Sequence, residues 1–516
     1  MFLSLLFLLK ATNLADFQKV STFFLPKYEP FIKDFSIFKL IIHVPALPLK
    51  PKISKMKYVY LILFTVLLMN ACTKTVTPED MLSDATKWQG VEKGYLTDGV
   101  LDLGSEFLTL VYQPGILNTY TNFEFSTEVL TEVGGHANIL FHTNKRYLDQ
   151  GYAVKIDNSA PGDWDRLLKT GSLSSVRNIF YRMLSDEEWF KLVIRVEENH
   201  IQVRVNGYPV VDYIEPEVPF RTPEIDKRRL SAGTFAIETG FGNTGVKFRN
   251  MNVSKLPPGE KRQNDDSDFT RQITELHSRH LPLVDFHVHE KGGLTLPLLI
   301  EKSAKLGINY GVAANCGLKF PIQNDEELKN YLASIKGMPI FKAMQAEGRE
   351  WVDMFSPDLV SEFDYAFTDA MTWTNRNGTR MRLWVPEETE VGDPEDFMEQ
   401  LVSQIEQVVT EPISIYVNPT FLPVEIEDRY DELWTDERVN RVVNSLVKNN
   451  VALEINSRTR LPGKKFIAKA KDAGVKFALG TNNTNAENLG KLEWAIEIIE
   501  EFNLQPTDMF LPGNSP

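Results

Sequence analysis

A repeat in the C-terminal half of the chain constrains the fold more than any other feature. Seven apolar, strand-like runs recur there, and six are followed by an amphipathic helix candidate. The runs are 283–288, 308–313, 340–346, 365–367, 413–417, 451–455 and 475–479. The helix candidates include 294–306, 395–409, 437–448 and 485–502. Short buried strands that alternate with helices predict a parallel sheet, and seven units predict a closed or nearly closed (β/α) barrel over 278–516.

The preceding segment, 85–256, has a different pattern. Its runs at 123–130, 152–156, 190–196 and 201–205 alternate apolar and polar residues. Turn signals such as Asn206-Gly207 separate these runs. Many short strands with few helical segments predict an antiparallel sandwich or jelly roll. The charged, turn-rich stretch 257–277 is predicted to be the linker between the two domains.

The N-terminal region differs from both domains. Residues 56–72 form a positive start, a short apolar core and a small-residue segment that ends at Cys72, which is typical of a signal peptide. The segment also resembles a lipoprotein signal, which implies lipidation of Cys72, a tether over 73–84 and anchoring in a bacterial envelope, facing the periplasm. Since a signal must open a chain, residues 1–55 are interpreted as a misassigned upstream extension, with Met56 as the true start.

Composition limits the classes of partner. The 516 residues carry a net charge of -14, and no basic surface that would neutralise nucleic-acid phosphates is expected. Two cysteines, Cys72 and Cys316, exclude a disulfide framework. The length predicts two or three domains. The sequence does not indicate the oligomeric state.

Polar residues follow every predicted barrel strand. Barrel enzymes carry their chemistry at these carboxyl ends, where the loops converge. His287 and His289 lie two residues apart at the end of the first strand, so both side chains face one side and would grip one divalent cation. The alternative is a hydrogen-bonded histidine pair that lines a metal-free pocket.

Five segments of the first domain resemble the 3-keto-disaccharide hydrolase family. They are Gly135–His142, Gly151–Asp157, Glu187–Lys191, Val205–Gly207 and Gly245–Met251. The resemblance implies a concanavalin-like jelly roll that acts on 3-keto-glycosides by lyase, hydratase or hydrolase chemistry. The chain departs from the family at His142, Ala153, Lys155 and 237–240, where catalytic-type residues are usual. We therefore expect sugar binding or scaffolding here rather than catalysis, although His136, His142 or Lys155 could substitute.

The second domain resembles the PHP (polymerase and histidinol phosphatase) family. His287, His289, Glu347 and the stretch 453–456 match its motifs. The resemblance implies a distorted (β/α)7 barrel with metal ions. Other family positions are changed to Asn315-Cys316, Asp369, Asn418-Pro419 and Asn482-Asn483, and no histidine follows His289. One divalent ion (Zn, Mn or Mg) is therefore expected, with two the upper limit. Its ligands would be His287, His289, Glu347 and Asp369.

These residues lead to three hypotheses. The first is a metal-assisted hydrolase or lyase for a 3-keto or other unusual glycoside, with Glu347, Asp369 and Glu454 as the catalytic groups. The substrate-binding candidates are Asn315, Arg349, Asn418, Asn456, Asn482 and Asn483. Trp351, Trp373 and Trp384 are candidates for stacking on sugar rings. The second hypothesis is a non-catalytic glycan-binding lipoprotein. The third is a phosphoesterase in which Arg349, Arg380, Arg382 and Arg458 hold an anion.

Overall fold

The computed structural model describes residues 78–92, 95–115, 119–161, 166–265 and 267–513. The predicted upstream extension 1–55, the signal peptide 56–72 and Cys72 lie outside these residues. Within the described residues, no helix combines the length and apolarity needed to cross a bilayer.

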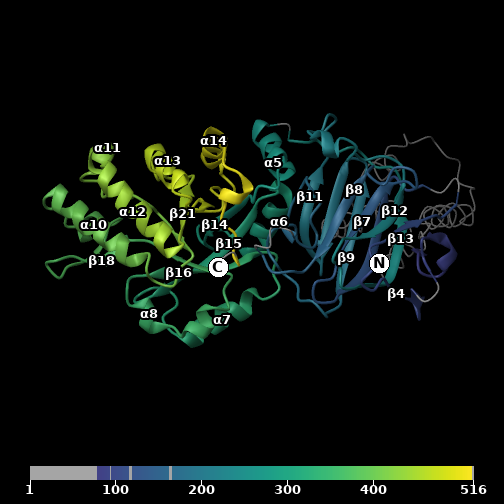
Figure 1. Cartoon of the computed structure of the whole chain (residues 1–516), viewed down its shortest axis with the longest axis horizontal. Helices are drawn as coiled ribbons and strands as arrows, with labels where there is room; N and C mark the ends of the chain where they lie inside the picture. The colour runs from purple at the N-terminus through teal and green to yellow at the C-terminus, as the bar shows by residue number, and fades with distance from the viewer. Residues whose placement is uncertain (1–77, 93–94, 116–118, 162–165, 266, 514–516) are drawn as a thin grey trace, which may run out of the picture. The chain divides into compact units, whose positions relative to one another are not determined.

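Two antiparallel sheets form a sandwich over the first part of the described chain (Figure 1). The larger sheet has the order β11-β10-β9-β6-β13-β4-β3, with β1 paired to β13. Its strands are β1 (Glu79–Asp80), β3 (Leu96–Thr97), β4 (Val100–Asp102), β6 (Phe123–Thr131), β9 (Phe190–Glu197), β10 (His200–Val205), β11 (Tyr208–Ile214) and β13 (Val246–Lys255). The smaller sheet, in the order β2-β5-β12-β7-β8, comprises β2 (Trp88–Gln89), β5 (Thr109–Tyr112), β7 (His136–Thr143), β8 (Tyr152–Asp157) and β12 (Thr234–Thr239). The predicted sandwich is confirmed.

A closed barrel of seven parallel strands forms the second part, as the repeat predicted. Its strands are β14 (Val284–Val288), β15 (Asn309–Gly317), β16 (Phe341–Glu347), β17 (Tyr365–Thr368), β20 (Ile415–Tyr416), β21 (Ala452–Asn456) and β22 (Phe477–Gly480). The helices are α5 (Asp268–Ser278), α6 (Leu296–Leu306), α7 (Asp325–Ile335), α8 (Trp351–Met354), α9 (Pro357–Val360), α10 (Pro394–Val408), α11 (Tyr430–Leu433), α12 (Asp436–Asn449), α13 (Lys464–Asp472) and α14 (Glu493–Glu501). The long loop predicted after the fourth strand contains the hairpin β18 (Thr372–Thr374) and β19 (Arg380–Arg382).

Three predicted boundaries were wrong. The tether predicted over 73–84 ends earlier, because β1 pairs with β13 and Met81 is fully buried in the sandwich core. The linker predicted over 257–277 ends at α5, which Ser267 caps by accepting a hydrogen bond from the Thr270 amide. The apolar residues of α5 then pack into the barrel cluster.

The helix predicted over 485–502 is also too long, since α14 begins only at Glu493. Asn485 accepts hydrogen bonds from the amides of Glu487 and Asn488, and Asn488 accepts one from Thr484. These local side-chain bonds form turns that compete with a helix. Gly490 follows with a φ of 82°, which a helix does not allow.

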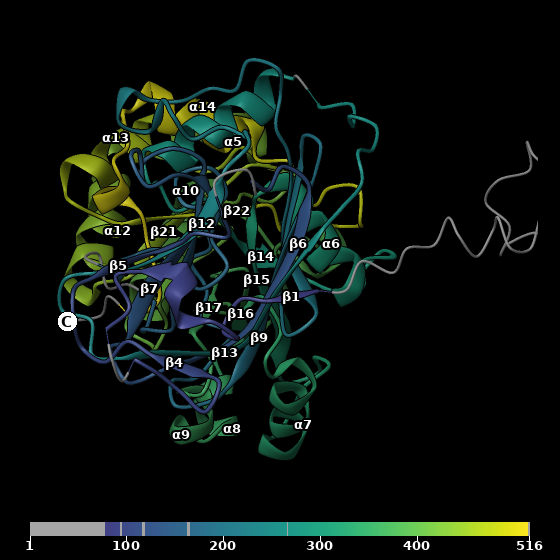
Figure 2. The same cartoon turned by 90° about the vertical axis from the view of Figure 1, so that its right-hand side faces the viewer.

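The sandwich contacts the amino ends of the barrel strands (Figures 1 and 2). Asn309, the first residue of β15, accepts a hydrogen bond from the Phe180 amide (2.9 Å) and donates one to the Asn178 carbonyl (3.0 Å). Tyr181 packs edge-on against Phe341, the first residue of β16. One apolar cluster therefore runs from the sandwich core into the barrel interior.

His277 of α5 is the buried centre of this junction. Its Nδ1 accepts a hydrogen bond from the Asn178 amide (3.2 Å), and its Nε2–H donates to the Gly307 carbonyl (2.8 Å). Burial first, and then the charge of Arg177, lowers the pKa of His277 to about 3. The ring is therefore neutral in the folded protein and joins the sandwich to two barrel helices.

We predict that His277→Leu lowers the free energy of unfolding by about 2–4 kcal/mol at pH 8, because it leaves buried backbone groups unpaired. The wild-type protein loses stability as the pH falls below about 6.5. In this range the histidine of the unfolded chain binds a proton, whereas the buried ring of the folded protein stays neutral. The stability gap between wild type and variant should therefore narrow by about 1.4 kcal/mol per pH unit between roughly pH 6 and pH 4. Urea unfolding at several pH values measures this gap.

Asn309→Leu is the matched control, because it breaks the same junction without removing a titratable group. It should destabilise the protein by an amount that is independent of pH in this window. An equal pH slope for both variants would contradict the assignment of a neutral, buried His277.

Candidate functional site

The carboxyl ends of the barrel strands bring nearly all the predicted site residues together. Strand β14 contains a bulge of one extra residue. Its pairing with β15 shifts by one residue between Asp285 and Val288. Such a bulge re-aims neighbouring side chains. Phe286 and His287 consequently both contact barrel residues: Phe286 packs on Phe341, and His287 lies against Phe367 at a ring distance of 4.9 Å.

His287 and Glu454 form the buried centre of the site, each with 1% of its side chain exposed. The His287 Nδ1–H donates to Glu454 Oε1 (2.7 Å), which leaves Nε2 as an acceptor. That Nε2 atom is buried and has no hydrogen-bond partner among the described residues. The second oxygen, Glu454 Oε2, accepts a hydrogen bond from the Asn418 amide (2.6 Å). The carboxylate thus fixes the imidazole with its free nitrogen available for a ligand or a proton.

Gly480 of β22 makes room for this pair. A Cβ at this position would lie 2.1 Å from Glu454 Oε1, which is far inside contact distance. The requirement for glycine is steric, because its φ is not positive.

His289 lies beside His287, with 5.4 Å between the ring centroids. Its Nδ1–H donates to the Ala313 carbonyl (2.9 Å). Burial, followed by the neighbouring His287 and the charge of Lys291, holds the pKa of His289 well below its usual range. The ring is therefore neutral and also keeps its Nε2 lone pair. Both side-chain ends of Asn483 bond to the backbone of His289, so this predicted substrate ligand instead fixes the histidine.

Glu347 and Asp369 form a carboxyl pair next to the histidines. Burial raises the pKa of Glu347 well above its usual range, and the charge of Asp369 raises it further. Burial also raises the pKa of Asp369, although its hydrogen bonds with Met371 and Asn418 oppose that shift. Burial and a neighbouring carboxylate both favour the protonated form of a carboxyl group. The pair is therefore a candidate proton donor.

Asparagines connect this pair to the rest of the rim, which is the set of side chains at the carboxyl ends of the barrel strands. Asn315 donates to Glu347 Oε1 (2.7 Å), and Asn418 donates to Asp369 Oδ2 (2.8 Å). Asn482 in turn donates to Asn418 Oδ1 (3.0 Å). Asn418 and Asn482 have φ values of 46° and 42°. Backbone in this region is uncommon for residues other than glycine and persists where the surroundings enforce it.

Two predicted substrate ligands have other partners. Arg349 Nη1 pairs with Glu411 (2.7 Å), and Nη2 donates to Thr368 Oγ1 (3.0 Å), so the guanidinium braces the rim. Asn456 is fully buried, and its Oδ1 accepts from the Thr459 amide. Its Nδ2 has no partner among the described residues.

Four rim residues were missed as site residues by the sequence analysis. Asp285 accepts hydrogen bonds from the amide and hydroxyl of Thr481, and it ties β14 to the loop after β22. Burial raises the pKa of Asp285 to about 7. Gln345 has a buried Oε1 atom that no hydrogen bond of the described residues reaches, and Lys291 donates to Asn482. Gln345 precedes Glu347 by two residues on a strand, a spacing that could have identified it.

The donor atoms of His287, His289, Glu347 and Asp369 are of the types that bind divalent cations. However, the part of the chain that the structure describes contains no group of three or more His, Cys, Asp or Glu side chains arranged to hold a metal ion. Carboxyl oxygens of the pair also accept asparagine hydrogen bonds. In the described structure these side chains are therefore not arranged as a metal centre, so binding of an ion would require them to rearrange, and the predicted ion stays a prediction.

A second polar group lies on the outer face of the smaller sandwich sheet. Strand alternation places Asn138, Lys155 and Glu238 there, and Asn138 donates to Glu238 Oε2 (3.3 Å). Burial lowers the pKa of Lys155, and Arg228 has a buried Nη1 with no partner among the described residues. His142 is not part of this group, because both of its ring nitrogens form hydrogen bonds with the backbone, one with the Thr121 carbonyl and one with the Ser231 amide.

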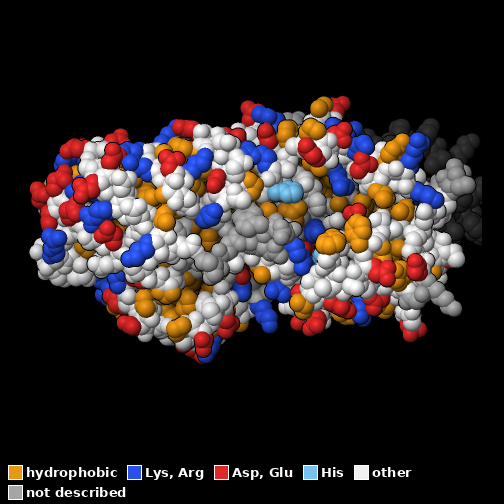
Figure 3. Space-filling model, viewed as in Figure 1, with side chains coloured by type: hydrophobic (Ala, Val, Ile, Leu, Met, Phe, Trp, Pro, Cys, Tyr) orange, Lys and Arg blue, Asp and Glu red, His pale blue; other side chains and the backbone are white. Residues whose placement is uncertain are grey.

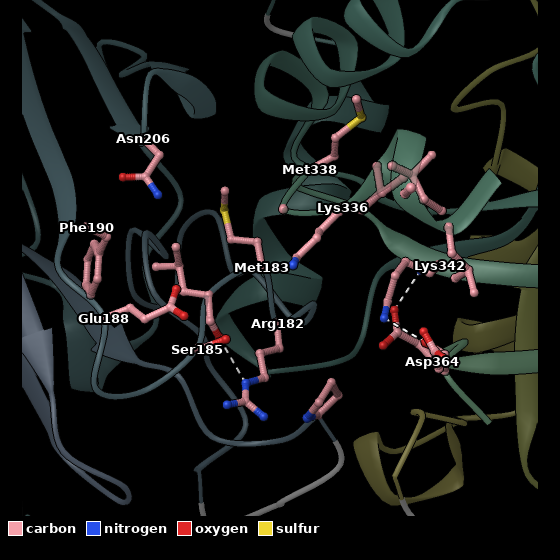
Figure 4. Close-up of a pocket in the computed structure, with 18 of the residues that line it drawn as sticks. Arg182, Met183, Ser185, Glu188, Phe190, Asn206, Lys336, Met338, Lys342 and Asp364 are labelled. Atoms are coloured by element: carbon pink, nitrogen blue, oxygen red, sulfur yellow. Dashed lines mark hydrogen bonds between the residues drawn. The ribbon is translucent and has the colours of Figure 1, made fainter. Parts of the chain in front are cut away.

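A cavity of about 730 Å³ lies between the sandwich and the amino ends of β16 and β17 (Figure 4). Arg182 and Met183 line it from the sandwich, and Lys336 and Lys342 line it from the barrel. Lys342 is already bonded to the Glu362 carbonyl. No buried side-chain nitrogen or oxygen among its described lining residues lacks a partner. This cavity is distant from the rim and offers no comparable chemistry.

Residues 80–254 match the family model of the 3-keto-alpha-glucoside-1,2-lyase-like domain. The match coincides with the sandwich, from β1 to β13, and ends before α5 and the barrel. No curated protein matches the chain.

Several solved structures are similar to part of the chain. A Parabacteroides distasonis protein, provisionally named a glycosyl hydrolase, shares 17% identity over 35% of this chain and 100% of its own, with a TM-score of 0.30. The carbohydrate-binding module CBM66 from Bacillus subtilis shares 10% identity over 30% of this chain and 96% of its own, with a TM-score of 0.22. The exoplasmic/lumenal domain of VIP36, bound to Ca²⁺ and Man3GlcNAc, shares 11% identity over 36% of this chain and 91% of its own, with a TM-score of 0.26.

We predict that Gly480→Ala lowers the free energy of unfolding by about 1–3 kcal/mol, because the new methyl group overpacks the Glu454 carboxylate. Gly259→Ala is the control: its Cβ would meet its nearest atom at 3.5 Å, and its effect should stay within about 0.5 kcal/mol. Denaturant unfolding measures both. Adding Glu454→Asp, which shortens the carboxylate, should recover part of the loss in the double variant. Strict additivity would contradict the proposed clash.

Proposed function

We propose that this protein is a carbohydrate-active enzyme that cleaves a 3-keto or similarly modified glycoside at the barrel rim. The observation that carries the proposal is the buried His287 Nε2 atom, which has no partner in the described chain while Glu454 fixes the opposite nitrogen. An oriented imidazole with a free lone pair is a general base. The glycoside class is supported by the family-model match of residues 80–254.

The carboxyl pair supplies the complementary acid. Burial first, and then the charge of Asp369, raises the pKa of Glu347 well above its usual range, which favours the protonated form of this carboxyl group. A catalytic acid and a catalytic base are commonly assigned where the surroundings move the pKa values of two titratable groups apart. We assign His287 as the base and Glu347 as the acid, with Asp369 holding the shared proton in place.

An elimination uses both groups. A keto group at C3 acidifies the hydrogen on C2, and His287 Nε2 would accept that proton. The C2–H electron pair then forms the C1–C2 double bond as the C1–O bond breaks. The proton of Glu347 passes to the departing oxygen, so charges and atoms balance. Water can later add across the double bond, which makes net hydrolysis a two-step outcome at the same site.

The exposure of the candidate tryptophans indicates which of them could contact a sugar ring. Of the three candidate tryptophans, Trp351 and Trp373 are buried, whereas Trp384 is 41% exposed. Trp384 follows Leu383, whose amide donates to the carbonyl of Met371, two residues after Asp369. An exposed indole close to the rim suits stacking on a sugar ring.

Glycan binding without catalysis is the second candidate, and one observation favours it. The outer sandwich face combines Lys155, Glu238 and the unpartnered Arg228 Nη1 atom. Binding at this face would hold a glycan without any contribution from His287. We retain envelope anchoring through Cys72 as a prediction that lies outside the described residues, together with the periplasmic location.

We predict that the protein turns over a 3-keto-glycoside and that His287→Gln or Glu347→Gln lowers kcat by about 10²–10⁴-fold. Lys155→Met is the matched control on the sandwich face and should leave kcat within about twofold of wild type. Chromatography of the released alcohol or sugar, with circular dichroism to verify folding, measures these effects. Loss of turnover in Lys155→Met alone would instead place the chemistry on the sandwich.

Metal binding is tested separately from turnover. We predict that the protein purified without chelator binds one equivalent of Zn²⁺ or Mn²⁺ in a calorimetric titration, and that His289→Ala abolishes binding. A bound ion would supply a Lewis acid for the keto oxygen. Absence of any binding heat and of metal by elemental analysis would remove the ion from the proposal while leaving the acid–base assignment intact.

A further inference from the structure

Two cationic side chains lie beside the candidate site and have no carboxylate partner within the described part of the chain. Lys291 follows the end of β14, and Arg458 follows the end of β21. Lys291 Nζ donates to Asn482 Oδ1 (3.2 Å). Arg458 Nε donates to the carbonyls of Thr481 (3.1 Å) and Asn482 (3.0 Å). Both side chains therefore meet at the same loop after β22, from opposite sides of that strand in the barrel order.

The two cations are near each other and near the reacting groups. Lys291 follows His289 by two residues, and its Nζ donates to Asn482 Oδ1 (3.2 Å). Asn482 donates to Asn418, which in turn donates to Asp369 of the carboxyl pair. The backbone carbonyl of Asn482 also accepts a hydrogen bond from Arg458 Nε (3.0 Å). These hydrogen bonds connect both cations to the candidate site.

Other arginines around the rim are neutralised. Arg349 pairs with Glu411, Arg380 with Glu350, and Arg382 with Glu388. These are three of the four arginines that kept an anion-binding hypothesis open in the sequence. Within the described residues, Lys291 and Arg458 have no ion pair at all, although the chain carries 70 acidic and 56 basic side chains. Without an ion pair among the described residues, both cations can meet an anionic ligand.

The free donors suit an anionic group. Each side chain uses a single nitrogen for its hydrogen bonds with the loop after β22. Two ammonium hydrogens of Lys291 and both Nη groups of Arg458 take part in no described hydrogen bond. Arginine and lysine together recognise carboxylate and phosphate oxygens, with arginine capable of two parallel bonds. Both residues are exposed, so an incoming ligand can reach them.

We infer that Lys291 and Arg458 form an anion subsite, so that the substrate is an acidic glycoside whose carboxylate or phosphate group anchors it beside His287. This inference rests on the proposed function. The anion takes the place of a missing acidic partner, and the sugar ring extends from it across Asn482 and Asn418 toward the carboxyl pair. Asn482 orients Lys291 through its Oδ1 atom and thereby links the subsite to the reacting groups.

Calorimetric binding of glucuronate, glucose 6-phosphate and glucose to the whole protein tests the subsite. We expect the two anions to bind at least about tenfold more tightly than glucose at low salt, with the preference reduced at high salt. The stronger of the two anions identifies carboxylate or phosphate as the natural group. Equal affinity for all three sugars would overturn the inference.

Single variants assign the effect to these residues. Lys291→Gln and Arg458→Gln should each weaken binding of the preferred anion by about tenfold while leaving glucose affinity unchanged. Arg382→Gln is the charge-matched control, because it removes one positive charge that Glu388 already neutralises nearby. An equal loss in the control would reduce the effect to overall charge and overturn the subsite.

The outcomes separate this inference from the proposed function. Turnover of a neutral 3-keto-glycoside without any anion preference would refute the subsite and keep the enzyme. Anion binding that depends on Lys291, in a protein without turnover, would keep the subsite and refute the enzyme. Hydrolysis of glucose 6-phosphate to phosphate would identify a phosphoesterase and overturn the glycoside assignment.

Discussion

Closure of seven parallel strands into a barrel is the constraint on which the site depends. It brings the ends of all seven strands to one rim, where polar groups crowd into a space that little water reaches. Each of them must then find a partner within the protein, because an unpaired buried polar group is costly. The chain from Asn482 through Asn418 to Asp369 meets this requirement. Buried polar atoms that lack a partner among the described residues, above all His287 Nε2, therefore point to the position of a ligand.

The asparagines bring hydrogen bonds but no charge to the rim. A cation or an imidazolium at positions 315, 418 and 482 would neutralise the buried carboxyl groups, whereas a neutral amide only donates hydrogen bonds. Burial first, and then the charge of Asp369, raises the pKa of Glu347, and the hydrogen bond from Asn315 opposes this rise only in part.

The surface outside the rim has a mixed character. On the face drawn in Figure 3, acidic and basic side chains are interspersed over the described residues, and no continuous basic area lies there. Lys291 and Arg458 differ from the other charged residues of the rim because both donate to the loop after β22. The two loops that carry them converge on Asn482.

Much of the fold could be predicted from the sequence, since continuous apolar runs in the barrel and alternating runs in the sandwich follow from burial on two faces or on one. The rim residues could be predicted because they follow those runs directly. The bulge in β14, the turns formed by Asn485 and Asn488, and the role of Gly480 could not, because each depends on tertiary contacts. Lys291 was missed because an isolated lysine after a strand has no pattern that distinguishes it from a solvated surface residue.

The junction at the opposite end of the barrel limits what the sandwich can do for the rim. Phe341 contacts the sandwich at the start of β16, and Glu347 stands at its end. At about 3.3 Å per residue, this strand separates the two by roughly 20 Å. Sandwich side chains at the junction therefore cannot touch a substrate bound at His287. If the sandwich binds sugar, its contribution is to hold a longer glycan and raise the effective concentration of that glycan at the rim. The rim must then complete the reaction with its own residues, which is consistent with the base, the acid and the anion anchor that we propose within the barrel alone.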